Sequence, residues 1–166
     1  MKTTLKLTAI LFSILLIACG GKEEKKKEGF SYEKKTSTEQ TVKKQTTVPA
    51  SKQIDLSNKG VGPITSLNLP AEIDQTMALH GADVFKKMCT ACHRPNKKFI
   101  GPAPIKILER RSPEWVMNMI LNPDEMVQKD PLAKALLVEF NGSPMANQNL
   151  TKEDARAVLE YFRTLK

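Results

Sequence analysis

The sequence is short and has little of several residue types. Its 166 residues include three cysteines, two histidines and one tryptophan, and aromatic residues make up only 5% of the chain. This length leaves room for one modest domain and excludes a large multi-domain enzyme. The alternation of apolar and polar residues that is typical of strands is nearly absent. The chain therefore lacks the signature of an α/β fold.

Positive charge is in excess, but it is not concentrated on the part of the chain that can fold. Of the net charge of +8, residues 1–18 carry +2, residues 19–60 carry +4 and residues 61–166 carry +2. A nucleic-acid-binding domain needs basic residues focused on a folded face. The distribution argues against nucleic acid as a partner.

A hydrophobic run long enough to span a membrane is also missing near the start of the chain. Two lysines precede an apolar run from Leu7 to Ile17, which is too short for a spanning helix and suits a secretory signal. The run ends in Leu16-Ile17-Ala18-Cys19, which resembles the bacterial lipobox. The resemblance implies that residues 1–18 are a lipoprotein signal peptide and that Cys19 carries the lipid. The alternative is an ordinary cleaved signal with a chance cysteine.

A lipid on Cys19 is expected to hold the protein on the periplasmic side of a bacterial membrane, and nothing nearby favours the inner or the outer membrane. Residues 19–60 are rich in Lys, Glu, Thr and Ser and are predicted to be a flexible linker. An alternative is a basic patch that grips anionic lipid, which the interleaved acids weaken. Residues 61–71 are predicted to be an extended lead-in along the surface of a domain at 72–166.

The sequence Cys89-Thr90-Ala91-Cys92-His93 is a C-x-x-C-H motif, which attaches c-type haem. Its two thiols can add across the two vinyl groups of a haem, while the next imidazole reaches the iron. With Cys19 assigned to lipid, no cysteine is left for a disulfide. Two alternatives are a thioredoxin-like redox pair and a zinc site completed by His80 and His93, and neither has enough support elsewhere in the chain.

The remaining pattern is helical. Gly81, Val84, Phe85 and Met88 share one face of a helix predicted from about residue 75 into the motif. Ser112-Pro113 and Asp130-Pro131 each begin another helix, with stops near Asn122-Pro123 and Asn141-Gly142. Thr151, followed by Asp154, begins a last amphipathic helix. The predicted fold class is all-α.

In this order of elements, residues 72–166 resemble a class I c-type cytochrome. The resemblance implies the cytochrome c fold, with about four to five helices around one covalently attached haem c. It also implies that the first and last helices cross closely, through Gly81, Phe85, Tyr161 and Phe162. Two stretches, at 113–123 and 144–150, are also similar to small lipoprotein cytochromes associated with bacterial nitrous oxide reduction.

The same resemblance assigns the axial ligands. His93 is the proximal ligand, and the carbonyl of Pro102, in a Gly-Pro pair, is expected to orient its ring. Met145, in the loop before the last helix, is the expected distal ligand, whereas His80 is expected on the surface and Met88 and Met119 in the core. Trp115 either donates to a haem propionate or fills the core.

An iron with two axial ligands has no open position, so we expect a monomeric electron carrier and not an enzyme. Its expected partners are the membrane, through Cys19, and redox proteins, with nitrous oxide reductase as a candidate. Two alternatives are a five-coordinate haem sensor or peroxidase-like protein and a fixed cytochrome subunit of a respiratory complex. Five basic residues could form a docking ring for an acidic partner, namely Lys86, Lys87, Arg94, Lys97 and Lys98.

Overall fold

The computed structural model describes residues 48–166, which form five α-helices and two short 3-10 helices. Within these residues there is no strand, only one isolated bridge between Asp55 and Arg111, so the all-α prediction is confirmed. None of the described helices is long and apolar enough to cross a membrane. The predicted signal peptide, Cys19 and the linker up to residue 47 lie outside the described residues.

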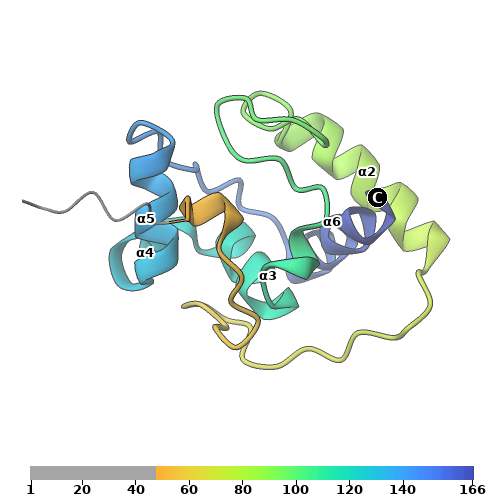
Figure 1. Ribbon diagram of the computed structural model, residues 1–166. Helices are drawn as coiled ribbons and strands as arrows, with labels where there is room; N and C mark the ends of the chain where they lie inside the picture. The colour runs from red at the N-terminus through yellow and green to blue at the C-terminus, as the bar shows by residue number, and fades with distance from the viewer. Residues whose placement is uncertain (1–47) are drawn as a thin grey trace, which may run out of the picture. The chain divides into compact units, whose positions relative to one another are not determined.

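Two helices that lie far apart in the sequence cross each other, α2 (Gln75–Met88) and α6 (Lys152–Thr164) (Figure 1). Both begin where the sequence places a cap. The side chain of Asp74 accepts from the backbone N–H of Met77, and Thr151 Oγ1 accepts from the N–H of Asp154 at 3.0 Å. These bonds satisfy N–H groups that the first turn of a helix leaves free.

Gly81 lets the two helices approach to backbone contact. A Cβ at this position would overlap the carbonyl oxygen of Ala157 and lie 2.8 Å from the amide nitrogen of Val158. Beside the crossing, the ring of Phe85 lies 5.5 Å from that of Tyr161 and 5.7 Å from that of Phe162, measured between centroids. The structure confirms the close crossing that the resemblance implies.

Three helices follow in quick succession between these two, α3 (Pro113–Leu121), α4 (Pro123–Lys129) and α5 (Pro131–Glu139). Each has proline in its first turn, where the missing N–H costs nothing. The sequence predicts α3 and α5 but not α4. In the sequence, Asn122-Pro123 indicates only the end of a helix, whereas in the structure Pro123 both ends α3 and begins the seven-residue α4.

The predicted linker extends too far, because its last part folds back onto the domain. We call residues 48–60 the strap; it contains η1 (Ala50–Lys52), which lies beside α5 (Figure 1). The N–H of Ser51 donates to Glu139 at 2.8 Å, and the amide of Asn58 donates to Asp130 at 2.7 Å. Ala50 is buried. The amino-acid composition of the strap does not indicate this contact, because hydrogen bonds hold the strap more than apolar burial does.

Residues 61–71 form no helix or strand and lie against α3. The side chain of Asn118 donates to the carbonyls of Lys59 and Ile64 at 2.9 and 2.8 Å and accepts from the N–H of Ile64 at 2.9 Å. The carboxylate of Glu114 accepts from the N–H of Leu67. Buried polar side chains of α3 therefore fix the course of this irregular segment.

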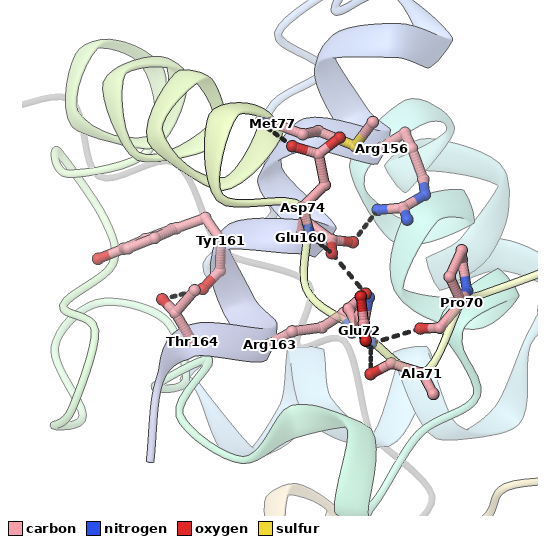
Figure 2. Close-up of polar contacts among 10 residues, drawn as sticks. All are labelled: Pro70, Ala71, Glu72, Asp74, Met77, Arg156, Glu160, Tyr161, Arg163 and Thr164. Atoms are coloured by element: carbon pink, nitrogen blue, oxygen red, sulfur yellow. Dashed lines mark hydrogen bonds and ion pairs between the residues drawn. The ribbon is translucent and has the colours of Figure 1, made fainter.

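A buried carboxylate joins the end of this segment to α6. Figure 2 shows Glu160, which is fully buried, between Arg156 and Arg163. Glu160 also accepts from the N–H of Asp74 at 2.8 Å. Arg163 donates onward to the carbonyls of Pro70, Ala71 and Glu72. The cluster thus holds the segment before α2 against α6.

Replacing Glu160 by glutamine is expected to lower the free energy of unfolding at neutral pH by about 3 kcal/mol, because it leaves two arginines without their buried anion. Burial raises the pKa of Glu160, but hydrogen bonds from Arg156 and Arg163 outweigh it and hold the pKa below its usual value. The unfolded state therefore binds the proton more readily, so this stabilisation is present above about pH 4.5 and is lost as the pH falls further. Urea unfolding at several pH values measures both effects. The control is Glu153→Gln, at an exposed position of α6; equal losses in the two variants would contradict the prediction.

Candidate functional site

The C-x-x-C-H motif forms a tight turn directly after α2. The N–H groups of Cys92 and His93 both donate to the carbonyl of Cys89, at 3.1 and 2.9 Å. Burial, with a smaller contribution from Cys92, raises the pKa of the Cys89 thiol to about 11. Cys89 is half-buried, Cys92 is exposed, and both are free thiols. One turn of backbone therefore presents both thiols and the imidazole from the same segment.

The imidazole of His93 is oriented by the Gly-Pro pair. Its Nδ1 lies 2.8 Å from the carbonyl oxygen of Pro102. Because a carbonyl only accepts, Nδ1 carries the proton and Nε2 keeps its lone pair for a metal. This is the contact that the resemblance predicts for Pro102. Gly101 lies against the ring, where a Cβ would be 2.5 Å from Cε1 of His93.

The motif lines one side of a cavity of about 380 Å³. The opposite parts of its wall come from α3, α5 and the loop after α5. The apolar lining includes Ile107, Trp115, Met119, Leu136, Phe140 and Met145. Two further basic residues line it, Arg110 and Arg111, for which no sequence pattern indicated a role. In the sequence they contribute only to the charge count, since their role depends on the fold around them.

The cavity narrows the choice of a second axial ligand. Met88, Met119 and Met145 line it, although Met88, which was expected in the core, exposes 38% of its surface. Met117 does not line the cavity and is buried in the core. His80 is on the exposed side of α2, with its Nε2 2.9 Å from Asp154, and does not line the cavity. Met145 is therefore placed on the same cavity as His93, as two helix methionines are. It remains the predicted ligand.

Trp115 lines the cavity, but its indole N–H donates to Asp130 at 3.2 Å. The indole has a single donor, which here has a protein partner. Of the two roles that the sequence left open, this bond favours packing in the core, and the propionate contact stays a prediction. Asp130 also caps α5, because its side chain accepts from the N–H of Ala133 at 2.7 Å.

The five basic residues predicted as a docking ring divide into two kinds. Arg94 is half-buried, lies 4.1 Å from the centroid of the Phe99 ring and donates to the carbonyls of Thr90 and His93. It is therefore occupied within the domain. The four lysines are exposed, and Phe99 and Ile100 beside them expose 45% and 46% of their surface.

The site fits the haem that the motif implies. Two thiols, an imidazole with a free Nε2, and a mostly apolar cavity are the components that covalent attachment and axial ligation require. The zinc alternative finds no support in residues 48–166, where no group of three or more His, Cys, Asp or Glu could hold a metal ion. The all-α fold likewise removes the context that a thioredoxin-like pair requires.

The chain is similar to known cytochromes c. The family model described as cytochrome c matches residues 78–166. A solved cytochrome c from Rhodothermus marinus is 42% identical, with a TM-score of 0.61, over 63% of this chain and 89% of that one. An engineered form of the Rhodothermus protein is 41% identical, with a TM-score of 0.60, over 63% of this chain and 90% of that one. A comparison with curated proteins gave no match.

Proposed function

The chain belongs to the cytochrome c family and carries electrons on one haem c, and we propose that it does so as a membrane-anchored carrier with His93 and Met145 as axial ligands. The observation that carries this proposal is the placement of His93. Its Nε2 is free, its Nδ1 is fixed on Pro102, and the cavity beside it is also lined by Met145. Bound haem supplies one-electron chemistry between Fe(III) and Fe(II).

The residues of this chain hold and enclose the cofactor. Cys89 and Cys92 would hold the haem covalently, each thiol adding its S–H across one vinyl group to give a thioether with no atom lost. The Nε2 lone pair of His93 and the thioether sulfur of Met145 would be the two protein ligands of the iron. With both ligands in place no substrate would reach the iron, and the chemistry that the haem would supply is the transfer of single electrons.

Absorption spectra of the haem-loaded protein test the ligand assignment. We expect the parent to show the weak far-red band of methionine-ligated ferric haem and not to bind carbon monoxide when reduced. Met145→Ala should lose the band and bind carbon monoxide, because it opens the distal position. The matched control is Met119→Leu, which changes another methionine on the same cavity and should behave as the parent does.

Carbon monoxide binding by the parent would contradict the carrier function and favour the five-coordinate sensor or peroxidase. Loss of the band in Met119→Leu but not in Met145→Ala would move the ligand to α3. Either result is read directly from the spectra, without a redox partner.

The anchor and the partner complete the proposal. The Leu16-Ile17-Ala18-Cys19 sequence supports lipid attachment and a place on the periplasmic side of the membrane. Labelling of the full chain with radioactive palmitate, with Cys19→Ser as the control, tests the anchor. Nitrous oxide reductase is proposed as the electron acceptor on sequence resemblance, supported by exposed lysines that suit an acidic partner. Electron transfer to the purified reductase should therefore slow as salt is added.

A further inference from the structure

The strap and α5 lie side by side at the surface of the domain. Ser51 donates to Glu139 at the end of α5, and Asn58 donates to Asp130 at its start, so the strap runs antiparallel to the helix. A hollow of about 250 Å³ lies between the two segments, lined by Gln53, Asp55, Asn58, Pro131, Leu132 and Ala135. The strap and α5 therefore form one continuous surface.

Exposed apolar side chains are concentrated on this surface. Within residues 48–166, five large apolar side chains expose more than half of their surface, and only Leu79 of α2 lies outside the strap and α5. Lys134 and Val138 are both exposed and are four residues apart, on one side of α5. We call this set the strap face; it consists of Val48, Lys52, Ile54, Leu56, Lys134 and Val138. Single exposed apolar residues are common, but a concentration of them marks an interaction site.

The exposed charges of the strap face are positive. Lys52 and Lys134 are exposed, and neither forms a salt bridge within residues 48–166. The nearby acids are less exposed and are bonded within the domain, Asp55 to Ser57 and Glu139 to Ser51. Aliphatic side chains with unpaired lysines between them are the combination that binds the interface of an anionic membrane.

The strap face directly follows the predicted linker. In the proposed function Cys19 carries the lipid, and residues 20–47 separate it from Val48. A linker of this length has a span of about 30 Å, and it keeps the domain at the membrane with an effective concentration in the millimolar range. A weak affinity of the strap face for lipid is sufficient under these conditions, because the anchor has already removed most of the cost of association.

We propose that the strap face docks on the membrane that holds the lipid of Cys19, and thereby fixes the distance and orientation of the haem site relative to the bilayer. The inference rests on the proposed function, since it takes the lipid anchor as given. The aliphatic side chains enter the boundary between headgroups and acyl chains, and the lysines contact the phosphates of anionic lipids. Most of the strap face lies before residue 78, where the family match begins, so the docking is a property of the N-terminal segment of this chain.

Energy transfer from a labelled lipid to the haem tests the docking. The lipid-anchored, haem-loaded chain is placed in vesicles of phosphatidylethanolamine and phosphatidylglycerol with a trace of lipid that carries a blue-emitting headgroup. The parent should quench this emission strongly. Ile54→Ser and Val138→Ser should each lower the equilibrium constant for docking about tenfold, since each removes an aliphatic side chain from the lipid, and the quenching should fall. The control is Leu79→Ser, which changes an exposed leucine outside the strap face and should quench as the parent does.

The lipid composition and the protein density give two further readouts. Vesicles with phosphatidylcholine in place of phosphatidylglycerol should reduce the quenching by the parent, because the lysines lose their anionic partners. Equal quenching by the parent, Ile54→Ser and Val138→Ser would overturn the inference. Quenching per protein that disappears when the protein is diluted in the vesicles would also overturn it, and would assign the strap face to a second copy of the chain. A parent that does not float with the vesicles would overturn the proposed anchor and the inference together, whereas equal quenching in an anchored series overturns the inference alone.

Discussion

Gly81→Ala is expected to lower the free energy of unfolding by about 4 kcal/mol or more, near the upper limit for a single substitution. The added Cβ would overlap the carbonyl oxygen of Ala157 and come within 2.8 Å of the amide nitrogen of Val158. Both are backbone atoms of α6, which cannot rotate away as a side chain can. Alanine also favours the helix over glycine by about 1 kcal/mol, which is too little to offset the overlap.

Urea unfolding of the haem-loaded protein measures this loss, and Asp83→Ala serves as the control. Asp83 is an exposed position of the same helix, so its replacement by alanine tests helix propensity without the crossing. We expect a change within about 0.5 kcal/mol for the control. If Gly81→Ala were as stable as the parent, α2 and α6 could not cross in backbone contact as they do here.

The sequence predicts those parts of the fold that depend on local signals. Helices of the structure begin at the capping pair of Thr151 and Asp154 and at the predicted Ser-Pro and Asp-Pro pairs. These starts can be predicted because caps act within four residues. α4 was missed because its only signal, Asn122-Pro123, also ends the preceding helix. The strap was missed for another reason. Its contacts with Glu139 and Arg111 join positions far apart in the sequence, and no local pattern shows such contacts.

The candidate site divides in the same way. The spacing within the motif determines Cys89, Cys92 and His93, and the Gly-Pro pair correctly indicated the contact of His93 with Pro102. The partner of the Trp115 indole could not be predicted, because the sequence indicates Asp130 only as the cap of a helix. Arg110 and Arg111 were also missed, since only the structure shows that both line the cavity and that Arg111 is buried.

Gly101→Ala is expected to weaken the proposed bond between His93 and the haem iron by about 10-fold to 100-fold, the range for residues that orient a metal ligand. The φ angle of Gly101 is not positive, so the backbone would accept alanine, and the demand for glycine is one of space. A Cβ would lie 2.5 Å from Cε1, 2.9 Å from Nδ1 and 3.0 Å from Nε2 of the His93 ring. The ring can move away only by giving up its hydrogen bond to Pro102.

The backbone of residue 101 cannot readily move away from the ring either, because the N–H of Gly101 donates to the carbonyl of Cys92 at 2.9 Å. Haem should still attach to Gly101→Ala, since both thiols are unchanged, but its ferric spectrum should show a high-spin fraction that the parent lacks. Pro102→Ala is the control, because the carbonyl that accepts from His93 belongs to the backbone and is retained. If Pro102→Ala became high-spin and Gly101→Ala did not, the proline ring, and not the space above the imidazole, would be what orients the ligand.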